Sequence, residues 1–285
     1  KGPVEDAQLI ESEEDLLQTF GQPYSIDNHY EYWMVASSFL AYGGVLQVIR
    51  ADDFNTQTGV GLKNAFVGTA SSIRIKSDTH YNQLGYDDNT ITGVTVASKT
   101  PGTYANGIRV AIIDSKADQV LTVSGISTVG LGITQSAAGR IVAGAAGTSV
   151  LDGYIKGIVT EVGTGTISVK TLAHVSTAGT VTNVNYQNGG VYNFATGNIS
   201  ASAAGTNVGG TAVNVTAVTD WFESQNIVLT QTDANGNPIS LEWDQLADAP
   251  GTSSYAAARG GRFDEVHVVV IDDKGTITGN AGTIL

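Results

Sequence analysis

Metal or acid–base chemistry in this chain would depend on its histidines, because it contains no cysteine and so no thiolate ligand or nucleophile. The four histidines lie in separate segments, at His29, His80, His174 and His267. A zinc or iron site needs ligands that converge, and no HxH or HxxxH spacing pairs any two of them. His267 lies in an apolar segment and is expected to be the most buried; its neighbours Asp264 and Glu265 are weak support for catalysis. We predict solvated or singly hydrogen-bonded histidines and no metal site.

The sequence motifs of common enzymes are absent or incomplete. The chain has neither the G-x-S-x-G elbow of hydrolases nor the Gly-Lys-Ser/Thr step of a phosphate-binding loop. The glycines at 130 and 132 lack the third glycine of a dinucleotide fingerprint. The segment from Asp233 resembles the start of a calcium loop, but Asp244 replaces the closing glutamate and Pro238 interrupts it, which favours a hairpin tip. The sequence therefore predicts no catalytic, cofactor-binding or metal-binding residues, and a binding or assembly protein rather than an enzyme.

Composition excludes several further classes of protein. The 285 residues carry a net charge of −13, which disfavours direct contact with nucleic acid, because a phosphate backbone requires Lys and Arg. No apolar run approaches the roughly 20 residues that a membrane helix needs. A hydrophobic content of 41% argues against disorder, and the 35 glycines show no collagen period. Because the chain opens at Lys1 without a signal-peptide core, it is expected to be a piece of something longer.

Charge is distributed unevenly along the chain. Four blocks differ in net charge, which is −8 over 1–60, +1 over 61–115, +1 over 116–219 and −7 over 220–285. The third block is low in charge and rich in Gly, Ala, Thr, Val and Ser, and composition changes sharply at both of its edges. This pattern predicts a domain inserted at 116–219 into a host domain that resumes at 220. The acidic pairs at 52–53 and 272–273 follow predicted strands and are expected to be solvated.

The first block has the pattern of two helices followed by a strand. Ser12 can cap a helix that ends at Gly21. A second helix is predicted over 27–42, with an inner stripe that includes Tyr30 and Trp33. The apolar run 45–49 then predicts a strand buried on both faces. We expect these two helices to cover a small sheet.

The remaining elements are predicted mainly as strands, because β-branched runs alternate with turn residues. They are expected over 73–76, 91–96, 108–113, 119–124, 154–162, 166–172, 180–186, 227–232, 239–243 and 266–271. The segment 101–107 is turn-rich and is predicted as neither helix nor strand. Strands at this spacing in the low-charge block predict a small sandwich or barrel. The aromatic residues Tyr30, Trp33, Trp221 and Trp243 are expected in the core.

Five motifs, in the same order, resemble the tail sheath protein of contractile-tailed bacteriophages. They are the Gly-Pro step at 2–3, the helix with Phe-Gly-x-Pro at 16–23, the helix–Gly–strand–Arg segment at 39–51, Pro-Gly-Thr-x-x-Asn at 101–106, and Pro-Gly-Thr-Ser with its continuation at 250–270. The resemblance covers roughly 1–115 and 220–285. It leaves 116–219 unmatched, as expected of the variable, outward-facing domains that sheath proteins insert into a shared core. The implied fold class is α+β, an α/β sheath core interrupted by an inserted mainly-β domain.

The resemblance also implies a function and partners. Copies of the chain would form a helical or stacked-ring sheath around an inner tail tube, and would contract to drive that tube through the host envelope for genome ejection. The implied partners are other copies, the tube protein, and baseplate and tail terminator proteins, with no cofactor, nucleic acid contact or membrane insertion. The implied location is the virion, after assembly in the host cytoplasm. An N-terminal arm before Lys1 and a larger C-terminal portion after Leu285 are likewise implied.

Two alternatives remain open on the sequence alone. The same motifs would serve a sheath of a bacteriocin-like or secretion-type contractile injection system. A different class of function is a β-rich surface adhesin that binds carbohydrate through 116–219. Gly/Thr/Asn-rich turns and Tyr154, Tyr186 and Tyr192 favour the adhesin, whereas the absence of tryptophan from that block disfavours it.

Overall fold

The computed structural model describes residues 1–23, 29–52, 61–84, 92–144, 147–202 and 211–285. The fold is β-rich, with 37% strand and 16% helix. The chain divides into two compact units, of which the first is formed by 1–110 with 269–285 and the second by 111–268. The second unit therefore contains 220–268 as well as the predicted insertion, although charge alone assigned 220–268 to the host domain.

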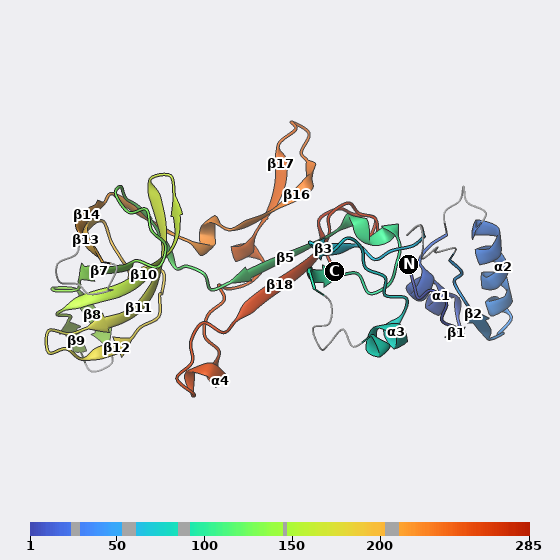
Figure 1. Cartoon of the computed structure of the whole chain (residues 1–285), viewed down its shortest axis with the longest axis horizontal. Coiled ribbons are helices and arrows are strands. Elements are labelled where there is room, and N and C mark those ends of the chain that lie inside the picture. Colours follow the sequence, from blue (N-terminus) through green and yellow to red (C-terminus); the bar gives the residue numbers. More distant parts are fainter. Residues whose placement is uncertain (24–28, 53–60, 85–91, 145–146, 203–210) are drawn as a thin grey trace. The chain divides into compact units, whose positions relative to one another are not determined.

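A small layer of two helices and two strands forms the start of the first unit (Figure 1, blue). Helix α1 (Glu13–Phe20) begins as predicted, because the Ser12 side chain accepts from the Asp15 amide at 3.1 Å. It ends at Gly21, whose φ of 83° favours glycine. Strands β1 (Gln8–Ile10) and β2 (Leu46–Val48) pair antiparallel. Helix α2 (His29–Ala41) packs on them, and the first two residues of the predicted helix, 27 and 28, lie outside the described residues.

The core of this layer lies between the helices and one face of the sheet. Ile10, Leu16 and Leu40 are buried at its centre, and Trp33 packs against them as predicted. Tyr30 was expected in this core, but it is 39% exposed in the first turn of α2.

The rest of the first unit consists of short elements. They are β3 (Phe66–Gly68), α3 (Asp78–Gln83), β4 (Val94–Ala97), the 3₁₀ helix η2 (Thr103–Gly107), β5 (Ile108–Asp114), β18 (Val266–Asp272) and β19 (Thr283–Ile284). β3 pairs with β4, and β5, β18 and β19 form one sheet. The unit boundaries fall within β5 and β18. The expected strand at 91–96 corresponds to β4, with residue 91 outside the described residues. The prediction that 101–107 is neither helix nor strand is wrong for 103–107, which form η2.

The predicted strand at 73–76 is wrong, although its alternation of buried and exposed side chains is present. Ile73 and Ile75 are each 6% exposed, but no strand among the described residues pairs with them. Instead the side chain of Asn64 hydrogen-bonds both backbone groups of Ile75. One polar side chain therefore satisfies the backbone where a strand neighbour would do so.

The second unit is organised around one eight-stranded sheet (Figure 1, green to orange). Its strands are β6 (Gln119–Thr122), β7 (Gly132–Ser136), β10 (Tyr154–Gly163), β11 (Thr166–Val175), β12 (Val181–Asn183), β13 (Gly197–Ser202), β14 (Thr211–Val215) and β15 (Ala217–Asp220). The order is β14-β13-β7-β10-β11-β6-β15, with β12 beside β11. The edge strands β14 and β15 are consecutive in the chain, because only Thr216 separates them. The sheet curls into a half-barrel. The prediction of a mainly-β domain in this part of the chain is therefore confirmed, with a half-barrel as its architecture.

The interior of the half-barrel is mainly apolar, and buried Gln119, Gln135 and Thr171 are polar exceptions. Its fully buried side chains come from alternate positions of the strands and include Leu121, Ile133, Ile155, Ile167, Val169, Ile199 and Val215. Phe194, from the loop between β12 and β13, is 2% exposed and fills the same core. Gly157 on β10 makes room for this ring, because an added Cβ would lie 2.7 Å from it.

Shorter elements complete the second unit. β8 (Ile141–Gly144) pairs with β9 (Gly147–Val150), and β16 (Asn226–Thr232) pairs with β17 (Pro238–Glu242) in the predicted hairpin. The 3₁₀ helices η3 (Phe222–Ser224) and η4 (Trp243–Gln245) and helix α4 (Ser254–Ala257) follow the sheet. Trp221 and Trp243 are buried, as predicted.

A cation–aromatic stack attaches the 262–263 segment to the half-barrel. Phe263 has a φ of 60°, which is rare for a bulky residue. The centroid of its ring is 3.9 Å from the Lys170 ammonium and 4.5 Å from the Arg262 guanidinium. Arg262 also donates to backbone carbonyls of β11 and of the residue after β12. Burial lowers the pKa of Lys170, although the neighbouring Asp118 opposes this shift.

Candidate functional site

The outward side of α2 carries an uncovered apolar stripe. Tyr32, Val35, Phe39 and Tyr42 recur at intervals of three and four residues, so they lie along one side of the helix. Their exposed fractions are 76%, 70%, 49% and 93%. A helix that is apolar on both sides is typical of one that is covered on both sides. We call these four residues the outer stripe.

The sheet of the same layer has a second uncovered apolar face. Leu9, Val45 and Ile49 are 60%, 56% and 62% exposed. They alternate with Ile10 and Leu46, which face the helices, so the exposed three point to the opposite side. We call them the outer sheet face. The expectation that 45–49 is buried on both faces is therefore wrong for this chain by itself, because only the helix-facing side is covered.

Two glycines fix the end of the outer stripe. Gly43 has a φ of 78° and ends α2 by donating to the Leu40 carbonyl. A Cβ on Gly44 would lie 2.2 Å from the Phe39 ring, so the ring rests directly on glycine backbone. The Gly-Gly pair thus holds Phe39 in its exposed position on the stripe.

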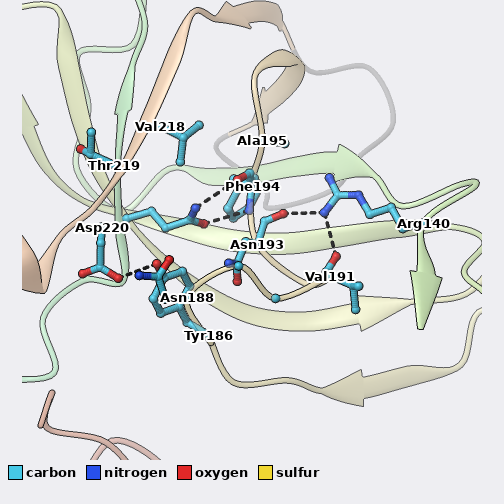
Figure 2. A pocket seen from close by; sticks show the side chains of 13 residues that line it. Arg140, Tyr186, Asn188, Val191, Asn193, Phe194, Ala195, Val218, Thr219 and Asp220 are labelled. Carbon is cyan, nitrogen blue, oxygen red and sulfur yellow. Dashed lines mark hydrogen bonds between the residues drawn. The ribbon is translucent and has the colours of Figure 1, made fainter. Parts of the chain in front are cut away.

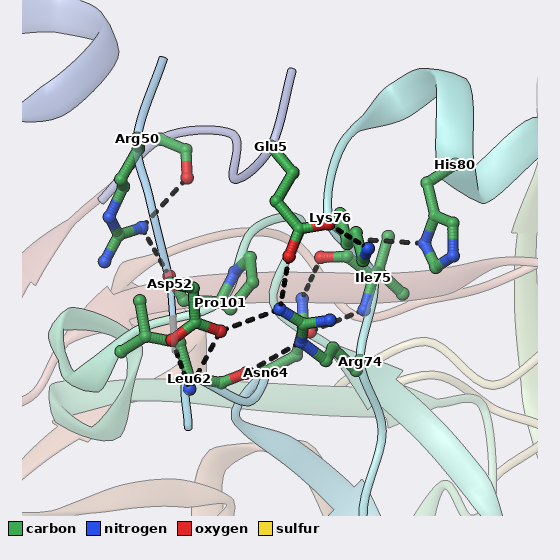
Figure 3. A network of polar contacts seen from close by, with 11 residues as sticks. Glu5, Arg50, Asp52, Leu62, Asn64, Arg74, Ile75, Lys76, His80 and Pro101 are labelled. Carbon is green, nitrogen blue, oxygen red and sulfur yellow. Dashed lines mark hydrogen bonds and ion pairs between the residues drawn. The ribbon is translucent and has the colours of Figure 1, made fainter. Parts of the chain in front are cut away.

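A network of polar contacts holds this layer to the rest of the first unit, and Figure 3 shows its members. Arg50, directly after the outer sheet face, donates from Nη1 to the Gly2 carbonyl at 3.0 Å and to the Pro101 carbonyl at 2.8 Å. The Arg50 carbonyl in turn accepts from the Glu5 amide at 3.0 Å. Gly102 lies so close to Arg50 that an added Cβ would come within 3.2 Å of the guanidinium, so a side chain at position 102 would crowd this arginine. Three of the five sequence motifs therefore meet at one arginine.

Asn64 has a comparable role in the same network (Figure 3). Its Nδ2 donates to the Ile75 carbonyl at 3.2 Å and to the Ser98 carbonyl at 2.7 Å, and its Oδ1 accepts from the Ile75 amide at 2.7 Å. The residue is 3% exposed. No sequence motif identified Asn64, because its partners are backbone groups that any residue type would present.

Ion pairs complete the network around a strained residue (Figure 3). Glu5 has a φ of 58° and pairs with Lys76 and with Arg74. Lys76, followed by Arg74, lowers the pKa of the Glu5 carboxyl. Arg74 also contacts Asp52 at 2.7 Å, and Asp52 accepts from the Leu62 amide. The Asp52 side chain is only 3% exposed, so the expectation that it is solvated is wrong, and residue 53 lies outside the described residues.

The motif that begins at 250 forms a closed loop of its own in the second unit. Glu265 accepts from the Gly251 amide at 2.7 Å. Asp264 accepts from both the amide and the hydroxyl of Ser253, and Ser253 caps α4. These two acids therefore position a loop, which accounts for them without catalysis.

The three histidines whose side chains are described, His80, His174 and His267, lie in separate places. His80 accepts from the Lys76 amide at 3.2 Å, and Nε2 of His174 lies 2.7 Å from the Asp152 carbonyl oxygen. His174 is the buried one, at 8% exposed, whereas His267 was expected to be. Across the described ranges, no group of three or more His, Asp or Glu side chains is placed to hold a metal ion.

The calcium-like segment is a hairpin tip. The Asp233 carboxylate accepts from the amides of Asn235 and Asn237, each at 2.8 Å, and from the Asn237 side chain. These donors, with Asn237 foremost, lower the pKa of Asp233. The carboxylate is thus used within the turn.

Asp272 and Asp273 are buried, contrary to the expectation that they are solvated. Asp272 is 0% exposed and accepts from the amides of Thr276, Ile277 and Thr278. Burial by itself would raise the pKa of Asp272, but these donors and the Thr278 hydroxyl lower it. Asp273 pairs with Arg109 at 3.1 Å.

We expect Asp272→Asn to destabilise the chain in a pH-dependent manner. Because the folded-state pKa lies below the unfolded value of about 3.9, the carboxylate stabilises the fold above that pH. This contribution is lost as the pH falls through the folded-state pKa. Urea unfolding should therefore separate wild type from variant clearly at neutral pH, and the difference should shrink in acid. If the difference in unfolding free energy between wild type and Asp272→Asn stayed constant with pH, the ionised Asp272 carboxylate would not be the stabilising group.

The comparisons with known proteins give no relative. No protein-family model, no curated protein and no solved structure matches this chain. No helix of the described residues is both long and apolar enough to span a bilayer.

Proposed function

We propose that this chain is a self-assembling structural subunit of a contractile phage tail sheath. The observation that carries the proposal is the pair of uncovered apolar faces, the outer stripe and the outer sheet face, on opposite sides of one layer. Contiguous exposed apolar surface marks a site of protein association. The five motifs that resemble sheath proteins support this choice of family, and three of them contain the residues that hold this layer in place.

Two different faces on opposite sides of a layer favour head-to-tail association. If the outer stripe of one copy packs on the outer sheet face of the next, the contact is heterologous and repeats to give a ring or a helix. Either product can surround a central tube. None of the seven residues that define the two faces is charged, so burying these side chains incurs no cost of unpaired charge. Exposed Gln47, between Val45 and Ile49, and exposed Glu31, beside Tyr32, would need polar partners at the contact.

The proposed activity is mechanical. Copies would surround an inner tail tube between a baseplate and a tail terminator, in the virion, after assembly in the host cytoplasm. Contraction would come from a second packing of the same subunits with better contacts, because packed interfaces have discrete alternative arrangements. No cofactor, nucleic acid contact or membrane insertion forms part of this proposal. A bacteriocin-like or secretion-type sheath would use the same contacts.

The test is to place charge on the outer stripe. We expect Val35→Glu with Phe39→Glu to weaken self-association by at least about 100-fold, because burying each apolar side chain contributes about 1.5–3 kcal/mol. Sedimentation velocity over a range of protein concentrations measures this effect. Asn82→Glu with Gln83→Glu on exposed α3 is the matched control for added charge and should associate like wild type. Equal association of wild type and the stripe variant would contradict the proposal, as would a wild type that stays monomeric.

A further inference from the structure

The second unit contains a pocket that the assembly proposal does not use. It has a volume of about 400 Å³ and lies on the half-barrel beside β6 and β15 (Figure 2). The loop between β12 and β13 supplies most of its lining, including Tyr186, Asn188 and Asn193. Asp220, at the end of β15, lies across from this loop. A pocket of about 300–1,000 Å³ is of the size that binds small ligands.

The loop that forms the pocket is fixed by side chains of the sheet. Nε2 of Gln119 donates to the Phe194 carbonyl at 3.0 Å, and its Oε1 accepts from the Phe194 amide at 2.8 Å. Arg140 donates to the carbonyls of Val191 and Asn193 (Figure 2). Phe194 itself fills the core. The pocket is therefore preformed, so binding would not have to order the loop.

The polar groups in the pocket are oriented and keep capacity for a ligand. The Tyr186 hydroxyl donates to Asp220 at 2.5 Å, so its oxygen lone pairs remain able to accept. Asn188 donates its amide to Glu223 at 2.9 Å, and its Oδ1 has no partner within the described chain. Oδ1 of Asn193 is buried and likewise has none among the described residues. Burial and the adjacent Asp220 raise the pKa of Tyr186, so the phenol stays protonated.

The lining favours an uncharged, polyhydroxylated ligand. Two charged side chains of opposite sign, Arg140 and Asp220, line the pocket. Both already hydrogen-bond to groups of the protein. The pocket therefore offers no unpaired charge to bind an anion or a cation. The aliphatic side chains Val191 and Val218 lie among the polar groups. A pyranose ring matches this mixture, because it presents hydroxyls at its edge and C–H groups on its faces.

We propose that this pocket binds one pyranose unit of a glycan. Tyr186 and Asn188 would hydrogen-bond the hydroxyls of the ring, while the valines contact its C–H face. This binding is independent of self-association, since the two sites lie in different units. In an assembly, many copies would display the pocket together, and weak binding to a single sugar would then be multiplied by avidity.

The test uses the full chain and a panel of methyl hexopyranosides, with and without an N-acetyl group, in saturation-transfer NMR. We expect at least one glycoside to receive saturation from wild type. Tyr186→Phe and Asn188→Ala should each weaken its affinity roughly fivefold or more, the effect of losing one hydrogen bond. Tyr154→Phe and Asn198→Ala, which change the same residue types outside the pocket, should leave the affinity unchanged.

Two outcomes would overturn the proposal. One is the absence of saturation transfer to every glycoside at millimolar concentration, with circular dichroism showing a folded chain. The other is binding that the pocket variants leave unchanged. Neither outcome bears on the outer stripe, whose test measures association instead.

Discussion

Replacing Phe194 with alanine will cost about 3–5 kcal/mol of unfolding free energy, the range for removing a buried aromatic ring. The ring is 2% exposed within the half-barrel core. The core cannot collapse readily onto the vacated space, because Gln119 holds the Phe194 backbone on both sides and Gly157 has no side chain to fill it. Since a domain is stable by only about 5–15 kcal/mol, this loss brings the second unit close to unfolding.

Urea unfolding followed by circular dichroism measures the effect of Phe194→Ala. Tyr255→Ala is the matched control, because Tyr255 is an aromatic residue of the same unit but is 67% exposed and contacts Arg259 at the surface. We expect the control to change stability by less than about 1 kcal/mol. If the two variants were equally stable, the placement of the loop in the core would be wrong.

Replacing Asn64 with leucine will have the second-largest effect, in the first unit. The variant leaves the amide and carbonyl of Ile75 and the carbonyl of Ser98 without their side-chain partner. Each buried, unsatisfied group costs about 1–3 kcal/mol, so we expect a total loss of roughly 3 kcal/mol or more. The extended segment 73–76 would still be held by the backbone hydrogen bonds from Asn64 to Ile73 and from Val4 to Lys76, so we expect local opening at Ile75.

Hydrogen exchange of the Ile75 amide, together with urea unfolding, measures the effect of Asn64→Leu. Asn82→Leu on exposed α3 makes the same chemical change where no buried partner depends on the side chain. It should leave both the exchange rate of Ile75 and the stability close to wild type. Unchanged protection of Ile75 in Asn64→Leu would show that the amide has another partner.

Elements with strong local signals could be predicted from the sequence. Helix α1 depends on Ser12 and Gly21, and both act on neighbouring backbone. The strands β10 and β11 were predicted at 154–162 and 166–172, because both segments are rich in Val, Ile and Thr and a Gly-containing turn separates them. The hairpin β16–β17 was predicted from the Asn-Gly pair at its tip.

The strands that were missed have weak local signals. β7, β8, β13 and β14 lie in segments of Gly, Ala, Ser and Thr, where few bulky side chains mark the alternation. Their pairing depends on the long-range order of the half-barrel, which places β14 and β15 at opposite edges although they are consecutive. The alternation of apolar and polar residues predicts which side chains of a strand face the core, but it does not predict which strands lie beside it.

The sites were harder to predict than the elements. Tyr186 was noted as an aromatic residue, but Asp220, Asn188 and the supporting Gln119 carry no spacing that identifies a pocket. The outer stripe was concealed for a different reason. The inner side with Trp33 was predicted, but a helix that is apolar all round gives no sign that its other side stays uncovered by its own chain.

The most direct test of the central claim, that copies of this chain associate through the two apolar faces, is electron microscopy of the purified protein at increasing concentration. The account predicts rings or striated tubes for wild type, and their loss in Val35→Glu with Phe39→Glu. Dispersed single particles at every protein and salt concentration would contradict it, as would tubes that the stripe variant still forms.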